Sequence, residues 1–235
     1  MKAYKKIKKC RICNSTNLKN VIDLNNQYIQ GSFLKKNHPK PFLKKIPLKL
    51  TLCSKCSLVQ LLHTTDKKIL YKNYWYESGI NSTMRSHLKE LAKEVSKLAK
   101  GNLINVLDIG CNDGTQLDIF KDKGIETHGI DPAKNLYRYS KSNHKVVNDY
   151  FSEKINFGTK FDMVVMQNSF AHQPNPRTFL ENIKKILQDD GFIFIQTSQA
   201  DMVKNNEFDT IYHEHINFYC AKSMNTLVES VGLKI

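Results

Sequence analysis

The sequence lacks any long apolar run. A membrane-spanning helix needs about 20 consecutive apolar residues, and no uninterrupted run in these 235 residues approaches that length. The basic N-terminus, MKAYKKIKKC, is not followed by the apolar segment that a secretory signal carries. We therefore expect a cytoplasmic protein with no membrane partner. Disulfides are rare in the cytoplasm, so the six cysteines need a different explanation.

Acidic residues are almost absent from the first sixty positions. This segment holds 14 Lys and Arg and one acid, Asp23, which leaves 22 basic and 21 acidic residues in 61–235. Nearly all of the formal net charge of +14 therefore lies in one part of the chain, which indicates two modules. A basic module can bind a phosphate-rich partner. Solvated lysines explain the same pattern, and we do not expect a nucleic-acid partner.

Four of the six cysteines form two C-x-x-C pairs, which are Cys10 with Cys13 and Cys53 with Cys56. Each pair places two thiolates on one tight turn, and two such turns can surround a tetrahedral ion, for which zinc is the best match. The long segment between the pairs must form its own hairpin or loop. The alternative, four free cysteines, requires two paired spacings to arise by chance. We expect a structural zinc site in a ribbon-like domain over residues 1–73.

From about residue 81 onward, helical and extended patterns alternate. Apolar residues recur at helical spacing from Met84 to Leu98, after an Asn81-Ser82-Thr83 segment that can cap a helix ending near Lys100-Gly101. Further helices are expected over 113–123 and 133–140, and from Pro176 to a turn at 189–191. Strands are expected over 105–110, 125–131, 144–151, 160–170 and 192–198. This order predicts an α/β domain over 74–235 with a doubly wound, mostly parallel, Rossmann-like sheet.

The turn after the first of these strands has the sequence DIGCNDG, from Asp108 to Gly114. Glycines at such a turn let the backbone approach a ligand at a helix N-terminus. Asp131 ends the second strand, a position from which a carboxylate can bind both ribose hydroxyls of a nucleoside. The turn resembles the D/E-x-G-x-G-x-G signature of class I S-adenosylmethionine-dependent methyltransferases. Asn112 replaces the middle glycine, and asparagine tolerates left-handed backbone.

That resemblance implies S-adenosylmethionine as the cofactor and a set of residues that would bind it. Asp108, Gly110, Asn112 and Gly114 would border the methionine moiety, and Asp131 would bind the ribose. Asn148, Asp149 and Tyr150 would flank the adenine, and Gln167 and Asn168 would face the sulfonium. The alternative is a glycine turn in an unrelated α/β fold.

The segment FDTIYHEHINFYC, 208–220, concentrates groups that can carry a proton in Tyr212, His213, Glu214 and His215. Together with the four cysteines, the glycine turn and the block YWYESGINSTMRSHL, it resembles the sugar C-methyltransferases that act on nucleotide-linked 4-keto-6-deoxy sugars. The resemblance covers nearly the whole chain. In that family the Tyr, Glu and second His of the motif form the active site, and they match Tyr212, Glu214 and His215.

These residue types suit methylation at carbon. A base would remove the proton at sugar C3, the C4 ketone would take the charge as an enolate, and the carbon would attack the sulfonium methyl. We expect His215 as the base, with Tyr212 and Glu214 in supporting roles. A second metal at this segment is not expected, because methyl transfer from a sulfonium needs no Lewis acid. Tyr76, Ser78, Asn81 and His172 are candidate substrate-side residues.

Two other functions stay open. One is a zinc-containing RNA-binding protein or RNA methyltransferase, although the N/D-P-P-[YF] tetrad is absent and the nearest segment is 168–171. The other is a non-catalytic, truncated remnant. Residues 221–231 predict a helix ended by Gly232, and Leu233 to Ile235 predict the opening of a sixth strand. Because class I sheets normally have seven strands, we expect strand five to be an exposed edge that invites a second chain or a homodimer, and weak or no turnover by these residues alone.

Overall fold

The computed structural model describes residues 3–30, 44–99 and 104–235. They belong to two compact units. The first unit comprises residues 1–70, 170–181 and 197–235, and the second comprises 71–169 and 182–196. Two segments that the sequence places in the domain over 74–235, namely 170–181 and 197–235, are thus part of the first unit. No described helix is long and apolar enough to cross a membrane.

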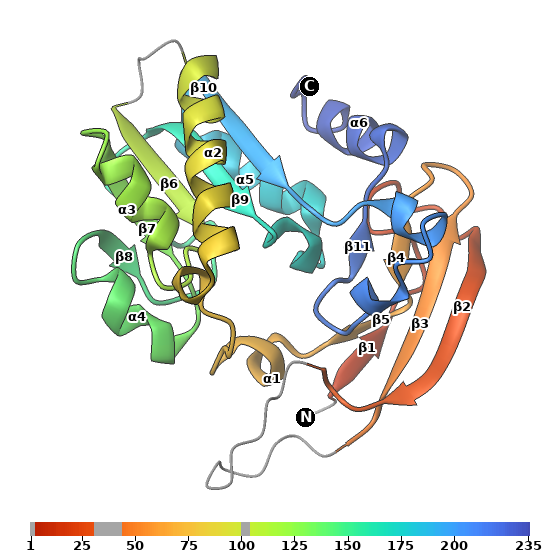
Figure 1. The fold of residues 1–235 in the computed structure, drawn as a ribbon. Helices are drawn as coiled ribbons and strands as arrows, with labels where there is room; N and C mark the ends of the chain where they lie inside the picture. Colours follow the sequence, from red (N-terminus) through yellow and green to blue (C-terminus); the bar gives the residue numbers. More distant parts are fainter. Residues whose placement is uncertain (1–2, 31–43, 100–103) are drawn as a thin grey trace, which may run out of the picture. The chain divides into compact units, whose positions relative to one another are not determined.

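A five-stranded sheet forms the centre of the second unit (Figure 1). The strand order is β10-β9-β6-β7-β8, and every neighbouring pair is parallel. The strands are β6 (Asn105–Ile109), β7 (Glu126–Ile130), β8 (Lys145–Val147), β9 (Phe161–Gln167) and β10 (Leu187–Gln196). Val106, Leu107 and Val164 are fully buried, as expected for parallel strands that are covered on both faces. The predicted parallel α/β sheet is confirmed, and β10 is an outer strand of it.

Helices precede or connect these strands as the sequence predicts. They are α2 (Ser82–Leu98), α3 (Thr115–Lys121), α4 (Lys134–Ser140) and α5 (Pro176–Ile186). The Asn81 side chain accepts hydrogen bonds from the N–H groups of Thr83 and Met84 at 2.8 and 3.4 Å, which confirms the predicted N-cap. Ala92 and Val95 of α2 pack in one buried cluster with strand residues such as Val106. The expected helix end near residues 100 and 101 lies outside the described residues.

Two strands differ from their sequence predictions. The turn expected at 189–191 lies inside β10, where the register jumps from Leu187 opposite Phe161 to Phe192 opposite Met163. The extra residues form a bulge, and Gly191 fits there because an added Cβ would lie 3.0 Å from the Phe161 carbonyl oxygen. β8 is shorter than expected, because beyond Val147 the Asn148 side chain donates to the carbonyl of Asp131 at 2.8 Å.

The first unit contains a four-stranded sheet in the order β11-β4-β3-β2, and all of its pairs are antiparallel. A separate pair joins β1 to β5. The strands are β1 (Tyr4–Lys6), β2 (Leu18–Gln27), β3 (Ile46–Cys53), β4 (Val59–Leu61), β5 (His63–Thr65) and β11 (Asn217–Phe218). Within the segment between the cysteine pairs, for which a hairpin or a loop is expected, β2 pairs with β3. Short helices complete the assignment: α1 (Lys67–Tyr71), η1 (Ser78–Ile80), η2 (Phe170–His172), η3 (Ala200–Val203), η4 (Phe208–Thr210) and α6 (Ala221–Glu229).

The C-terminal segment ends in a helix cap. Gly232 has a φ of +71°, its N–H donates to the carbonyl of Glu229, and the N–H of Leu233 donates to that of Val228. This is the Schellman pattern, and it confirms Gly232 as the helix terminator. The prediction that a sixth strand opens at Leu233 to Ile235 is wrong, because these residues form no strand. The N–H of Leu233 is used by the helix cap.

Candidate functional site

The four cysteines of the C-x-x-C pairs lie together in the first unit. Their Sγ atoms are all within 4.8 Å of one another, and the Cys10–Cys56 and Cys13–Cys53 sulfur distances are 3.5 Å. Tetrahedral zinc with Zn–S bonds of about 2.3 Å has sulfurs about 3.8 Å apart, so these side chains fit the ion. A hydrogen bond from Cys56 lowers the pKa of Cys10 to about 4, and the same contact raises the pKa of Cys56. A bound dication would deprotonate the thiols that coordinate it.

The same backbone hydrogen bonds hold both cysteine turns, which we call the knuckles (residues 10–15 and 53–58). The N–H of Cys10 donates to the carbonyl of Ser15 at 2.8 Å, and that of Cys53 donates to Leu58 at 2.9 Å. The carbonyls of the same two cysteines accept from Asn14 and Ser57, which have φ values of +57° and +64°. Backbone geometry therefore sets the sulfur positions in each knuckle.

Arg11 lies between two of these cysteines, and sequence reasoning gave it no role. Its guanidinium donates to the Gln60 side chain at 3.2 Å, the Leu61 carbonyl at 2.7 Å and the Thr64 hydroxyl at 2.7 Å. Burial lowers the pKa of Arg11 to about 10, while Tyr219 and Cys10 act in the opposite direction. The side chain is thus a partly buried cation at neutral pH.

In the second unit, the turn between β6 and α3 lies at the carboxyl edge of the sheet, where open α/β sheets bind ligands. Gly110 and Gly114 both have a φ of +90°, which other residues rarely adopt. A Cβ added at Gly110 would lie 2.7 Å from the Cβ of Ser169. Glycine at 110 is therefore required by both backbone conformation and space.

Two buried carboxyl groups meet beside this turn. One oxygen of Asp131 accepts from the N–H of Asn112 at 3.0 Å, and the other accepts from the N–H of Ala133 at 2.8 Å. Burial raises the pKa of Asp131, against these two donors. Burial also raises the pKa of Asp108 to about 8, and Asp131 and Asp113 contribute to the rise. Each Asp131 oxygen keeps a second lone pair for a ribose hydroxyl, so the group fits a nucleoside.

The Asn112 side chain holds the segment of residues 76–79, which we call the strap. Its Nδ2 donates to the carbonyl of Tyr76 at 2.9 Å, and its Oδ1 accepts from the N–H of Ser78 at 3.0 Å. The neighbouring Asp113 carboxylate accepts from the N–H of Gly79 at 2.7 Å. A Cβ at Gly79 would come within 2.6 Å of Thr115 Oγ1. Two candidate substrate residues, Tyr76 and Ser78, are thus tied by their backbone to the glycine turn.

The other residues expected around the cofactor occupy varied positions in the second unit. Asp149 is exposed and its carboxylate accepts from the Tyr150 N–H at 2.7 Å. Asn168 is exposed with a φ of +56°. The Gln167 amide donates to Gln116, a buried residue that sequence reasoning missed because helix position alone gave no signal.

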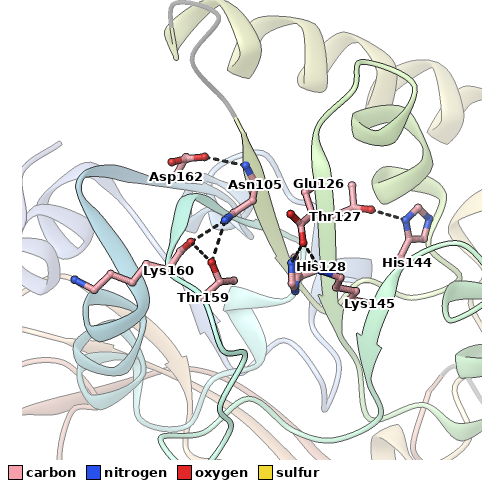
Figure 2. Close-up of polar contacts among 9 residues, drawn as sticks. All are labelled: Asn105, Glu126, Thr127, His128, His144, Lys145, Thr159, Lys160 and Asp162. Carbon is pink, nitrogen blue, oxygen red and sulfur yellow. Dashed lines mark hydrogen bonds and ion pairs between the residues drawn. The ribbon is translucent and has the colours of Figure 1, made fainter.

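A second polar cluster lies at the opposite, amino edge of this sheet (Figure 2). Asn105 donates to the Lys160 carbonyl at 2.8 Å, and Thr127 contacts His144 Nδ1 at 2.7 Å. Glu126 pairs with both His128 and Lys145. These contacts join neighbouring strands and loops at the edge away from the glycine turn, so we assign them to the fold.

The YHEH segment lies in the first unit, and two of its side chains are in direct contact. The Tyr212 hydroxyl lies 2.6 Å from His215 Nε2, and the two rings are 4.1 Å apart. Burial lowers the pKa of His215 to about 4, so its imidazole is neutral at pH 7. Burial, assisted by the charge of Glu214, raises the pKa of Tyr212. Glu214 itself is buried.

His213 points to a different environment from its neighbours. Its Nε2 lies 3.2 Å from the Ile46 carbonyl, and its Nδ1 lies 3.0 Å from the Gln30 side-chain amide. The residue is 2% exposed, and burial lowers its pKa. Among the described residues, the only cluster with metal-ligand geometry is that of the four cysteines. We therefore assign His213 to packing of the segment against β3.

Two further side chains adjoin His215. The Ser198 hydroxyl lies 3.2 Å from His215 Nδ1, a contact that the sequence did not signal because Ser198 is a single polar residue after a strand. The ring of His172 stacks on that of His215 at 5.4 Å, and burial lowers the pKa of His172 to about 3. Both nitrogens of His215 are thus hydrogen-bonded, to Tyr212 and to Ser198.

Comparison with known proteins matches both parts of the chain. A family model described as a methyltransferase domain matches residues 81–235, and one described as a zinc binding domain matches residues 10–71. C-methyltransferase NovU of Streptomyces niveus is 28% identical over 97% of this chain and 56% of its own length. A ubiquinone biosynthesis O-methyltransferase of Glaesserella parasuis is 31% identical over 39% of this chain and 44% of its own. The chain therefore spans about half the length of these relatives.

Solved structures show the same fold. The plantazolicin methyltransferase BpumL in complex with SAH has a TM-score of 0.54 at 17% identity, covering 63% of each chain. A SAM-dependent methyltransferase from Archaeoglobus fulgidus has a TM-score of 0.54 at 19% identity, covering 63% of this chain and 68% of its own. At these identities the comparison concerns the fold alone, which is the Rossmann-like fold of class I methyltransferases.

Proposed function

Because the chain belongs to the methyltransferase domain family, we propose that it is the cofactor-binding and acid–base part of an S-adenosylmethionine-dependent C-methyltransferase. The observation that carries the proposal is the partly buried Tyr212–His215 pair, with a 2.6 Å hydrogen bond and a neutral imidazole. Oxygen and nitrogen acceptors have lone pairs, whereas a carbon acceptor must first lose a proton to a base. The name of the relative NovU, a C-methyltransferase, supports this assignment.

The proposal places cofactor binding in the second unit. S-adenosylmethionine, when bound, supplies an electrophilic methyl group. The free lone pairs of Asp131 would accept its ribose hydroxyls, and the glycine turn with Asp108, Gly110, Asn112 and Gly114 would border its methionine part. Asp149 and Tyr150 would flank the adenine, and Gln167 and Asn168 would face the sulfonium.

Acid–base chemistry belongs to the first unit in this proposal. Since both nitrogens of His215 are hydrogen-bonded, the proton reaches the base through the Tyr212 hydroxyl. The substrate C–H bond breaks as its proton passes to the Tyr212 oxygen, and the tyrosine's own proton passes to His215 Nε2. The two transfers are concerted, because the raised pKa of Tyr212 disfavours a free tyrosinate. Glu214, buried nearby, would stabilise the imidazolium that forms.

The substrate class we propose is a nucleotide-linked 4-keto-6-deoxy sugar. A carbonyl beside the reacting carbon is required, because it takes the charge left by deprotonation as an enolate. The resemblance of the YHEH segment to sugar C-methyltransferases supports a sugar as the carrier of that carbonyl. Tyr76, Ser78, Asn81 and His172 are the candidate substrate-side residues, although the Asn81 amide also caps α2.

Exchange of a substrate proton with deuterated water tests the base directly. The chain is incubated with a panel of nucleotide 4-keto sugars and S-adenosylhomocysteine in D₂O, and deuterium at C3 is read by mass. We expect exchange in the wild type and its loss in His215→Gln, with binding of S-adenosylhomocysteine retained. This readout needs proton abstraction only, so it does not depend on full turnover.

The matched control is His63→Gln, a histidine of β5 in the same unit that lies outside the YHEH segment. It is expected to exchange at the wild-type rate. Exchange that persists in His215→Gln would move the base elsewhere. Incubation with labelled S-adenosylmethionine then identifies the methylated sugar, and label on RNA in place of a sugar would favour an RNA methyltransferase.

A further inference from the structure

Arg11 connects the four-cysteine cage to the segment that bears the proposed base. It sits in the first knuckle between Cys10 and Cys13, and its guanidinium is partly buried. Among the described residues, the hydrogen-bond partners of the guanidinium are Gln60, Leu61 and Thr64, and none of them is a carboxylate. A buried cation needs a compensating charge. Four thiolates around one Zn²⁺ leave a net charge of about −2 on the cage, so the cage can supply it.

The strand that Arg11 holds, β4, also pairs with β11, the strand that follows the YHEH residues. Gln60 of β4 lies opposite Asn217 of β11, and the N–H of Leu61 donates to the carbonyl of Ile216 at 2.9 Å. His215 directly precedes these residues. Movement of β4 would therefore be transmitted to His215 by the backbone hydrogen bonds.

The second knuckle also contacts this segment. The Cys220 thiol donates to the carbonyl of Ser57 at 3.6 Å, and Ser57 is the left-handed residue of that knuckle. Asn217 Nδ2 donates to the carbonyl of Gln173 at 2.8 Å, next to His172. Residues 216–220 thus connect the two knuckles with the segments that carry His172 and His215.

The junction contains buried polar atoms whose hydrogen-bonding capacity is unused within the described residues. They are Arg11 Nε, Gln60 Nε2, Asn217 Oδ1 and the Tyr219 hydroxyl. Buried polar atoms that stay unpaired are destabilising. The junction therefore depends on its remaining contacts, and loss of the charge on either side would release it.

We propose that Arg11 is a positioning residue, which couples the zinc cage to the segment 211–220 and so holds Tyr212 and His215 in contact. This inference rests on the proposed role of His215. It gives the metal a function beyond folding the N-terminal module. The cage does not touch the reacting atoms, but its charge fixes Arg11, Arg11 fixes β4, and β4 fixes β11.

Amide hydrogen exchange of the intact chain, read by mass for each peptide, tests this coupling. Arg11→Met is expected to keep one zinc per chain and normal binding of S-adenosylhomocysteine, and to exchange residues 211–220 about tenfold faster. Exchange over 105–131 in the second unit should not change. Removing zinc from the wild type with a chelator should raise exchange across the first unit, residues 211–220 included, and Arg11→Lys should restore part of the protection that Arg11→Met loses.

Arg177→Met is the matched control, because Arg177 is an arginine of the same unit that contacts Ser230 at the surface. If Arg11→Met does not fold, Thr64→Val removes one acceptor and should raise exchange over 211–220 by about threefold. The ¹⁵N shifts of His215 give a readout that loss of stability elsewhere would not move, since the imidazole pKa should rise towards its ordinary value as the segment opens.

Unchanged exchange over 211–220 in zinc-loaded Arg11→Met and Thr64→Val would overturn the coupling. Faster exchange confined to residues 10–15 and 53–58 would also overturn it. If the coupling holds but no substrate proton exchanges in the wild type, the proposed C-methyltransferase function fails while the link between the cage and His215 stands.

Discussion

At the scale of single residues, Asn112 shows how a departure from a signature can acquire a role. Its φ of +53° is one that glycine adopts freely and other residues adopt at a cost. The side chain compensates with three hydrogen bonds, to Tyr76, Ser78 and the N–H of Asp113. Restoring the signature glycine would relieve the backbone and release the strap.

Asn112→Gly is therefore expected to lower the stability of the second unit by about 2 kcal/mol and to loosen the strap. Lost side-chain hydrogen bonds cost about 1 kcal/mol each, and relief of the left-handed backbone offsets about 1 kcal/mol. Trp75, the only tryptophan of the chain, precedes the strap and reports on it. Acrylamide quenching of its fluorescence should increase about twofold as the segment becomes mobile.

The control for this substitution is Asn206→Gly. Asn206 is an exposed asparagine with a φ of +58° in the first unit, far in sequence from the strap. It changes the backbone in the same way and should leave the quenching of Trp75 unaltered. Equal quenching in wild type and Asn112→Gly would show that Asp113 and Gly79 hold the strap without Asn112.

At the scale of elements, local backbone hydrogen bonds close each of the two knuckles, and a bound ion would join one knuckle to the other. Cys13→Ser is expected to abolish zinc binding and unfold the first unit, because ion binding contributes directly to the folding of such small modules. The second unit has its own buried cluster around Val106 and Phe120. Binding of S-adenosylhomocysteine by titration calorimetry should therefore stay within about threefold of wild type.

The comparison for Cys13→Ser is Cys111→Ser, which changes a buried cysteine of the second unit outside the cage. Metal analysis should find about one zinc per chain in Cys111→Ser and none in Cys13→Ser. Zinc retained in folded Cys13→Ser would remove Cys13 from the ligand set. Loss of cofactor binding in Cys13→Ser would show that the second unit does not fold independently.

Local patterns made the elements of the second unit predictable, because capping, apolar spacing and turn residues act over short distances. Asn81 caps α2 in the second unit as the sequence indicates, and in the first unit Gly232 likewise ends α6. The pairing of β11 with β4 was not predictable, since Asn217–Phe218 is a two-residue strand whose partner lies far away in the sequence. The contact of His213 with Ile46 was missed for the same reason. The prediction of a turn at 189–191 was wrong, because these residues form a bulge within β10.

The candidate site follows the same division between local and distant contacts. The spacing of Asp108, Asn112 and Asp131 indicated that they would meet at one sheet edge, and the N–H of Asn112 does bond Asp131. The proximity of Tyr212 and His215 follows from their neighbourhood in the sequence. Ser198 and Arg11 could not be found that way, because each is a single polar residue whose partners come from other segments.

At the scale of the whole molecule, titratable groups with shifted pKa values make the stability of the two units change with pH in opposite directions. Burial lowers the pKa values of His172 and His215 in the first unit to about 3 and 4 from 6.5. The unfolded chain therefore binds more protons below pH 6.5, and stability is lost as the pH falls from 6.5 towards 4. In the second unit, burial raises the pKa of Asp108 from 3.8 to about 8. There the folded state binds the extra proton, and stability is lost as the pH rises towards 8.

We expect the chain to be most stable near pH 6.5. Loss of stability of the first unit should set the limit at lower pH, and that of the second unit should set it at higher pH. Each titrating group contributes up to about 1.4 kcal/mol per pH unit to these slopes. Denaturant unfolding followed by Trp75 fluorescence reports the second unit, and exchange of peptides from 211–220 reports the first. Asp108→Asn should flatten the loss of stability of the second unit between pH 6.5 and 8. Asp122→Asn, at an exposed position of the same unit, should leave that loss unchanged.

His215→Gln should flatten the loss of stability of the first unit between pH 6.5 and 4. An alkaline decline that survives in Asp108→Asn would mean that another group holds the proton in the folded state.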